Sequence, residues 1–398
     1  MLKSATSRAM SSVTPGKVVS GTAPHFYDIG LNLTDPMFQG IYHGKQKHAS
    51  DISNVLFRAS ECNVKSVLLT GSSFTESKDA MKLAQVWRDN SFALNLYYTV
   101  GVHPCCVNEF ALQHQNQTID RPSNDEEYNS QLHNSVSSDP ATAVTNLRKL
   151  FDLIQLSMQN SQFRAIGEIG LDYDRLHYSS REMQQIFFEE QLKLSCLVND
   201  DKKPLFLHMR SCAGDFIRIL KKFIIGFLDH EDRFQLRDLV HEGDKDNAIF
   251  YKFNPDRKFV VHSFTDSLED LSSLLQLSPN CYIGMNGASF RSSENIDCVR
   301  EVPLDRLLLE TDSPWCEMKR THESAKYMDN ADVSRYQSVK KEKLDKIPRE
   351  EWNLYTVKGR NEPCHMASVA ALVANVKKIS LDEVIQTVWS TSCKVYGE

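Results

Sequence analysis

Short apolar runs alternate along this chain with longer amphipathic stretches, and this alternation is the strongest indication of its fold. The runs are rich in residues that favour strands, whereas the stretches between them show a helical period. The eight runs cover residues 26–31, 64–70, 97–103, 163–168, 204–208, 258–262, 281–285 and 306–312. Eight strands with intervening helices predict an α/β fold, and a closed (β/α)8 TIM barrel rather than an open sheet.

The stretches between the runs predict helices over residues 52–62, 76–88, 147–158, 181–198, 215–228 and 268–277. Three long segments interrupt the repeat, at residues 109–143, 229–257 and 318–350. Loops of this length in a compact fold are commonly functional covers or disordered excursions. The third segment is dense in lysine and arginine, for which a solvated surface and a phosphate-binding role are alternatives.

We expect residues 26–398 to form a single barrel domain that carries these segments as insertions. Residues 1–25 contain Lys3, Arg8 and Lys17 with many serines and threonines and no acid. This composition indicates a disordered tail, with a mitochondrial targeting segment as the alternative.

The composition narrows the class of protein. The chain of 398 residues has a formal net charge of -6, so contact with nucleic acid requires a local basic patch or bound cations. No apolar run approaches the length of a membrane helix. The ten cysteines form no C-x-x-C pair, which is typical of reduced thiols in an intracellular protein. We therefore expect a cytoplasmic protein, with the nucleus as a second compartment.

Five of the eight predicted strands end in a side chain that can bind a metal ion. These side chains are His103, Glu168, His208, His262 and Asp312. Because the carboxyl ends of barrel strands meet at one face, they are expected to share a pocket. Imidazole nitrogens and carboxylate oxygens suit Mg²⁺, Mn²⁺ or Zn²⁺. One such histidine is usually structural, but several ionisable groups in one pocket need a compensating cation, so the pattern indicates a metal-dependent hydrolase.

Each of these residues also has a structural alternative. Glu168 lies between glycines that leave room for a ligand, although an exposed glutamate in a glycine-shaped turn has the same pattern. Asp312 is able to bind metal and accept a proton, or to cap a helix. His103 is placed to orient a phosphate or protonate a leaving oxygen. Arg210 offers a fork for phosphate, or a structural ion pair.

Motifs along nearly the whole chain resemble the TatD family of metal-dependent deoxyribonucleases, in its eukaryotic branch. They lie at residues 28–33, 70–71, 101–104, 166–172, 208–210, 262–265, 310–314 and 360–363. The resemblance implies a TIM barrel that hydrolyses DNA phosphodiester bonds, single- or double-stranded, notably by 3'-to-5' exonuclease action. It implies one or two divalent cations, with Mg²⁺ expected and Mn²⁺ or Zn²⁺ as alternatives.

The resemblance also implies roles for single residues. Metal ligands would be Glu168, His208, His262 and Asp312, and His103 would meet the substrate. From the residues themselves, we expect Asn32 and Arg210 to contact the substrate as well. Catalysis would involve Glu168, Asp312 and His103.

The first strand departs from the family pattern. Many relatives carry His-x-His where this chain has Gly30-Leu31-Asn32. Asparagine is a weaker ligand than imidazole, so we expect loosely held Mg²⁺ rather than tightly bound Zn²⁺.

These expectations combine into a mechanism in which a metal-activated water attacks the phosphorus and Asp312 takes its proton. One alternative is a metal-dependent amidohydrolase or esterase acting on a small molecule, since the same barrel supports both reactions. Another is a relative that binds nucleic acid without turnover. Endonuclease action and the oligomeric state stay open. Missing motifs argue against a P-loop NTPase, a zincin and a serine hydrolase.

Overall fold

The computed structural model describes residues 25–89, 91–113, 124–239, 248–328 and 335–398. Within these ranges eight parallel strands form one sheet in the order β1-β4-β5-β6-β7-β10-β11-β12. Their bounds are β1 Phe26–Leu31, β4 Val64–Leu69, β5 Asn95–Val100, β6 Phe163–Asp172, β7 Leu205–Arg210, β10 Phe259–His262, β11 Cys281–Met285 and β12 Leu307–Leu309. The predicted tail at residues 1–24 lies outside the described residues.

The two edges of this sheet meet, so that the predicted barrel is confirmed. Leu31 at the end of β1 forms a parallel bridge with Ser313, just after β12. The backbone N–H of Asn32 donates to the carbonyl of Ser313 at 2.8 Å, and that of Asp312 donates to the carbonyl of Gly30 at 2.8 Å. Closure therefore takes place at the carboxyl end of the first and last strands, beside the predicted site.

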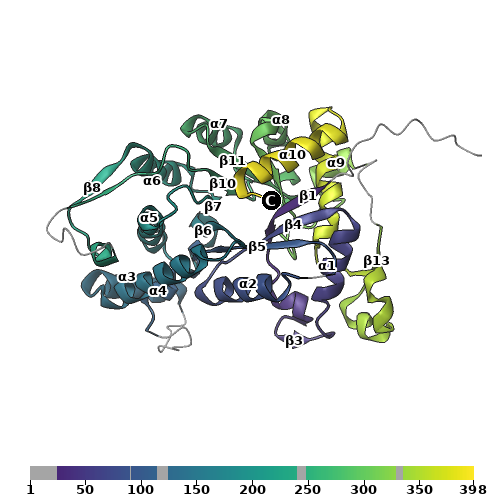
Figure 1. Ribbon diagram of the computed structural model, residues 1–398, viewed down its shortest axis with the longest axis horizontal. Coiled ribbons are helices and arrows are strands. Elements are labelled where there is room, and N and C mark those ends of the chain that lie inside the picture. Colours follow the sequence, from purple (N-terminus) through teal and green to yellow (C-terminus); the bar gives the residue numbers. More distant parts are fainter. Residues whose placement is uncertain (1–24, 90, 114–123, 240–247, 329–334) are drawn as a thin grey trace, which may run out of the picture.

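Helices surround the barrel in Figure 1. Their bounds are α1 Ile52–Glu61, α2 Phe74–Val86, α3 Asp125–Ser138, α4 Ala141–Met158, α5 Arg181–Leu197, α6 Ala213–Ile225, α7 Leu268–Leu277, α8 Ser293–Glu301, α9 Met366–Lys377 and α10 Leu381–Tyr396. The six predicted helices are present: α7 has the predicted bounds, and the other five are shifted at one or both ends, while α3, α8, α9 and α10 were not predicted. None of the helices in the described ranges is long and apolar enough to cross a membrane.

The predicted end of one helix was wrong for a local reason, and one insertion contains a helix that was not predicted. The helix predicted to run to residue 228 ends at Ile225, because Gly226 has a φ of 95° and the chain then forms β8 (Phe227–Asp229). β8 pairs with β9 (Ile249–Tyr251), so the second insertion begins and ends in a hairpin. The first insertion contains α3, which starts where the Asn124 side chain accepts a hydrogen bond from the N–H of Glu126.

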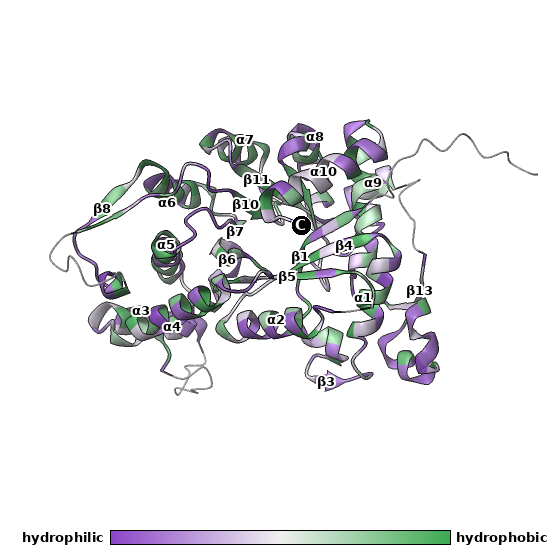
Figure 2. Cartoon of the chain, in the orientation of Figure 1, coloured by the Kyte–Doolittle hydropathy of each residue, from purple (hydrophilic) through white to green (hydrophobic). Residues whose placement is uncertain are grey.

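The core has two layers, as the alternation along each strand requires. One set of strand side chains fills the barrel interior, including Tyr27, Tyr97 and Phe206. The other set packs against the helices, whose green, hydrophobic sides face the sheet in Figure 2. Tyr396 of α10 joins the interior set, with its ring 6.0 Å from that of Tyr27. The interior is therefore filled and the barrel is not a pore.

The last part of the third insertion, with the residues that follow it to 357, folds into a small unit of its own beside α1 (Figure 1). Its ordered parts are β13 (Gln337–Val339), the 3₁₀ helices η8 (Lys341–Lys346) and η9 (Arg349–Leu354), and β14 (Tyr355–Val357), which pairs with β13. Leu344, Trp352 and Val357 pack on Tyr42 of the hairpin β2 (Ile41–Tyr42) and β3 (Lys45–Gln46). This small apolar cluster joins the insertion to the loop that follows β1.

A buried group of four charges anchors the same region. Arg58 of α1 donates from Nε to Glu362 at 2.8 Å and from Nη1 to the carbonyl of Trp352 at 2.8 Å. Arg360 donates to Asp51 at 2.6 and 2.7 Å and to Glu362 at 2.8 Å. These four charged side chains are at most 1 % exposed. Two positive and two negative groups thus balance within the core.

Candidate metal centre

The carboxylate of Glu168 lies in the middle of β6 rather than at its end, which corrects the predicted strand boundary. The strand continues to Asp172, and its register with β7 shifts between Gly167 and Ile169. Gly167 has a φ of 147°, and a Cβ there would lie 2.1 Å from the carbonyl oxygen of Phe206. Only glycine fits this irregular position, which directs the next side chain into the site.

Three imidazoles converge on the Glu168 carboxylate. Its Oε1 atom lies 2.6 Å from His262 Nε2, 2.9 Å from His208 Nδ1 and 3.5 Å from His103 Nε2. Its Oε2 atom accepts a hydrogen bond from the Ser72 hydroxyl at 3.1 Å. All four metal-capable side chains are buried, at 4 to 8 % exposed. The structure therefore gathers four of the five predicted residues around one carboxylate.

The electrostatics of this cluster centre on Glu168 and His262. Burial acts to raise the pKa of Glu168, but the positive charge of His262 and hydrogen bonds from His208 and His262 bring it well below its ordinary value. Burial acts to lower the pKa of His262, but Glu168 and Glu310 raise it well above its ordinary value. A proton on His262 thus supplies positive charge between two carboxylates.

His103 is a neutral hydrogen-bond donor. Its Nδ1 atom accepts a hydrogen bond from the N–H of Cys105 at 3.0 Å, so the ring proton lies on Nε2, which faces Glu168. Burial lowers the pKa of His103 to about 3 despite the opposing charge of Glu168. This state favours holding a phosphate oxygen over protonating a leaving group.

Asp312 lies three residues after β12, with a φ of 52° in the left-handed region. Its carboxylate accepts hydrogen bonds from Asn32 Nδ2 at 2.9 Å and from Cys316 Sγ at 3.2 Å. Burial raises its pKa to about 6; the charge of His262 opposes this rise and that of Glu310 adds to it. Asp312 and Asn32 therefore face each other across the closure of the barrel, beside the imidazoles.

Two carboxylates of the cluster were not predicted. Asp172 Oδ2 lies 3.1 Å from His208 Nε2, so that imidazole is held between two carboxylates. Glu310 Oε1 accepts from Asn286 Nδ2 at 3.2 Å, while Oε2 lies 3.5 Å from His262 Nδ1. Both residues stand in the motifs around Glu168 and Asp312, where the alternation of strand side chains could have placed them on the site's side.

The side chain of Glu310 explains the glycine in the first strand. A Cβ at position 30 would lie 2.5 Å from Glu310 Oε2, and Glu310 is fully buried. The carboxylate occupies the space that a side chain at position 30 would fill. A larger residue at this position requires Glu310 to move.

Replacement of Gly30 by alanine is expected to lower the free energy of unfolding by about 1–3 kcal/mol, because the new methyl group overpacks a filled space. Urea unfolding would measure the loss. Gly214→Ala is the matched control, since no atom lies within 4 Å of its added Cβ and alanine favours a helix by about 0.5–1 kcal/mol. Equal stability of Gly30→Ala and the unchanged protein would contradict the close contact.

Arg210 lies at the end of β7, opposite Asp172 in the register of β6 and β7. Burial acts to raise the pKa of both Asp172 and Asp266. The charge of Arg210 contributes to the lowered pKa of Asp172 and only opposes the rise in the pKa of Asp266. The guanidinium forms no ion pair within 4.0 Å to a carboxylate of the described residues. The structural ion pair that the sequence leaves as an alternative for Arg210 is thus absent among the described residues. Its guanidinium group stays available at the mouth of the site.

The cluster fits a divalent cation. His262 Nδ1 and Glu310 Oε2 are buried and have no hydrogen-bond partner among the described residues. Ligand atoms of His103, Glu168 and His208 lie within 4.8 Å of one another. Nitrogen and oxygen donors of this kind suit Mg²⁺, Mn²⁺ or Zn²⁺. A cation bound here would supply positive charge to the cluster. Without a cation, the protonated imidazole of His262 supplies this charge.

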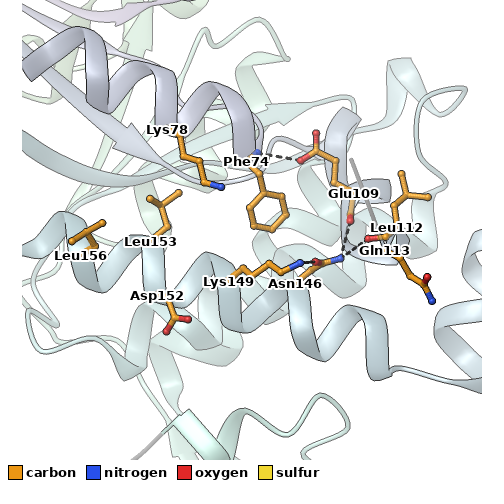
Figure 3. A pocket seen from close by; sticks show the side chains of 10 residues that line it. All are labelled: Phe74, Lys78, Glu109, Leu112, Gln113, Asn146, Lys149, Asp152, Leu153 and Leu156. Carbon is orange, nitrogen blue, oxygen red and sulfur yellow. Dashed lines mark hydrogen bonds between the residues drawn. The ribbon is translucent and has the colours of Figure 1, made fainter. Parts of the chain in front are cut away.

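A separate hollow of about 640 Å³ lies between α2 and α4 (Figure 3). Its polar groups bond to one another: Glu109 accepts from the N–H of Phe74 at 3.1 Å, and Lys149 donates to Asn146 at 3.0 Å. Asn146 in turn donates to the carbonyl of Glu109 at 3.1 Å. These bonds tie the chain after β5 to α4, and none of the metal-capable residues lines the hollow.

Comparison with known proteins agrees with this geometry. The profile of the TatD related DNase family matches residues 28–397. A Saccharomyces cerevisiae protein named Deoxyribonuclease Tat-D is 55 % identical over 94 % of this chain and 91 % of its own length. An Erwinia tasmaniensis protein named 3'-5' ssDNA/RNA exonuclease TatD is 29 % identical over 73 % of this chain and 80 % of its own.

A crystal structure from Saccharomyces cerevisiae, described as an uncharacterized amidohydrolase, superposes with a TM-score of 0.84 at 51 % identity. The superposition covers 94 % of this chain and 99 % of that one.

Proposed function

Since the chain belongs to the TatD family of deoxyribonucleases, we propose that it is a metal-dependent enzyme that hydrolyses DNA phosphodiester bonds by 3'-to-5' exonuclease action. The observation that carries the proposal is the buried Glu168 carboxylate with imidazole nitrogens at 2.6, 2.9 and 3.5 Å. The names of its relatives, a deoxyribonuclease and an ssDNA/RNA exonuclease, support the substrate. A metal-dependent amidohydrolase or esterase is the second candidate.

The proposed metal ligands are Glu168, His208, His262 and Asp312, which would hold one or two cations, with Mg²⁺ expected. When bound, such a cation polarises the phosphodiester and lowers the pKa of water. Asp172, hydrogen-bonded to His208 Nε2, orients that imidazole, as partners of metal-binding histidines generally do.

The remaining residues bind and orient the substrate. The Nε2–H of His103 donates to a phosphate oxygen, and the free fork of Arg210 neutralises charge on the same group. Asp312 accepts the proton of the attacking water. Its pKa of about 6 leaves its carboxylate ionised at neutral pH, as this role requires. Asn32 holds Asp312 in place by its 2.9 Å hydrogen bond and contacts the substrate at the closure of the barrel.

We also propose the wider organisation of the protein. Residues 26–398 form one catalytic domain that includes the three insertions. All ten cysteines are free thiols, which suits the reducing environment of the cytoplasm or nucleus.

A nuclease assay with a metal titration tests this function. The protein is expected to shorten 5'-labelled DNA from its 3' end when Mg²⁺ is present and to lose this activity in EDTA, because ionised Glu168 and its imidazoles need a cation to bind phosphate. Added Mg²⁺ should restore the activity. Parallel assays on single-stranded DNA, duplex DNA and RNA define the substrate. Hydrolysis of small esters or amides without any DNA cleavage would replace the nuclease by the second candidate.

A further inference from the structure

Eight cations gather on one small part of the surface, in a chain whose formal net charge is -6. They belong to two segments: residues 41–47, which contain the β2–β3 hairpin, and residues 337–358, which contain the small unit formed by β13, η8, η9 and β14. We call these two segments the basic platform. The cations are Lys45, Lys47, Lys340, Lys341, Lys343, Lys346, Arg349 and Lys358, against the acids Glu342, Asp345, Glu350 and Glu351. The platform is thus locally positive in a protein that is negative elsewhere.

These cations are not neutralised by acids of the described residues, although Lys341 and Arg349 lie over the rings of Tyr42 and Trp352. Six of the eight are exposed, and Lys47 and Lys341 are half-buried. None of them forms an ion pair within 4.0 Å to a carboxylate of the described residues. By contrast, Lys193 and Lys222 near the β8–β9 hairpin are each paired, at 2.7 and 2.5 Å. An unpaired cluster of one sign is the electrostatic pattern of a surface that binds a polyanion.

The platform is held rigidly. Tyr42, Leu344 and Trp352 form its apolar cluster, and the Lys341 ammonium lies 4.7 Å from the centre of the Tyr42 ring. Arg58 ties η9 to α1 through the carbonyl of Trp352 at 2.8 Å. A surface that is ordered before binding loses little conformational entropy when it binds a ligand.

The platform also borders the candidate metal centre. The β2–β3 hairpin follows β1, whose end places Asn32 on Asp312. Just after the platform's last residue in the sequence, Asn361 donates from Nδ2 to the carbonyl of Thr311 at 2.9 Å. Thr311 is the residue before Asp312. Lys358 is three residues before Asn361, so their Cα atoms are at most about 11 Å apart. A strand with its end in the site would reach the platform within a few nucleotides.

We propose that the basic platform binds the phosphate backbone of the nucleic-acid strand beyond the nucleotides that occupy the metal centre. The proposal rests on the proposed nuclease function and adds a second contact region to it. Lysines on an ordered surface contact phosphates without reading bases, so the platform raises affinity for long strands of any sequence. A dinucleotide is too short to reach it.

A triple substitution tests the platform. Lys340, Lys343 and Lys346 are exposed on or beside η8 and are changed to glutamine; Lys341 is left because it packs on Tyr42. The control variant changes Lys65, Lys202 and Lys258 to glutamine. These lysines lie at the amino ends of β4, β7 and β10, and thus at the opposite mouth of the barrel. Both variants lose the same charge.

The first measurement is binding of a fluorescent single strand of about 30 nucleotides by each variant in a Glu168→Gln background, over a range of salt concentration. Removing three phosphate contacts should weaken binding on the order of tenfold and reduce the slope of log K against log salt by about 2. The control variant should keep both values. Equal behaviour of the two variants would overturn the proposal.

The second measurement compares kcat/KM for the long strand with kcat/KM for a dinucleotide. The ratio of these two values should fall in the platform variant, because KM for the long strand rises. If DNA is cleaved and this ratio is unchanged, the platform is refuted while the nuclease function stands. If the unchanged protein cleaves neither substrate, while the platform variant loses the salt-dependent binding of DNA, the proposed nuclease function is refuted instead. Loss of binding to anionic vesicles or acidic peptides, with DNA binding intact, would assign the surface to another partner and overturn the proposal.

Discussion

Glu168→Gln is expected to reduce kcat for DNA cleavage by about a hundred- to a thousandfold or more, while the protein stays folded. The uncharged amide cannot balance the charge of His262 or of a bound cation, and its carbonyl oxygen is a weaker acceptor for the three imidazole nitrogens that lie 2.6, 2.9 and 3.5 Å from Oε1. Single-turnover assays at saturating Mg²⁺ would measure the change. The variant also loses the partner that raises the pKa of His262.

An exposed glutamate supplies the control for this prediction. Glu301 at the end of α8 is exposed, and Glu301→Gln should keep full activity. Circular dichroism and thermal unfolding of both variants separate a loss of chemistry from a loss of fold. Undiminished cleavage by Glu168→Gln would remove Glu168 from the proposed mechanism and with it the metal centre.

Glu362→Gln is expected to lower the free energy of unfolding by about 3–5 kcal/mol, because it leaves Arg58 and Arg360 buried with a single carboxylate. The Glu362 carboxylate accepts from Arg58 at 2.8 Å and from Arg360 at 2.8 Å, and all of these side chains are fully buried. Chemical unfolding would measure the loss. Glu350→Gln, exposed in the same insertion, is the matched control and should be neutral.

The same carboxylate has a defined pH dependence. Burial acts to raise the pKa of Glu362, but the charges of Arg58 and Arg360 lower it to about 2. Because the folded value lies below the unfolded value of about 4.3, the stabilisation is complete above that pH and is lost as the pH falls toward 2. The difference in stability between Glu362→Gln and the unchanged protein should therefore shrink in acid. A difference independent of pH would contradict the ionised state of Glu362.

Alternation of apolar and polar residues along the chain was sufficient to predict the barrel and the face on which its site lies. The strand-forming runs are short, apolar and rich in residues that favour strands, and the stretches between them have an amphipathic helical period. The polar helix α3 escaped this reasoning because it buries few side chains, although its Asn124 cap and three acids in the first turn were readable. Gly226 marked the end of α6 in the same way.

For the metal centre, the sequence determined the residue types and only the tertiary structure decided their contacts. His103, Glu168, His208 and His262 stand at strand ends or bulges, and barrel closure brings residues as far apart as Glu168 and His262 within 2.6 Å. The pairing of Glu310 with the space at Gly30, the proton on His103 Nε2, and the place of Asp172 depend on side-chain packing between different strands. A linear pattern records which groups a strand offers; which groups meet depends on register and closure, because those set distances between residues remote in sequence.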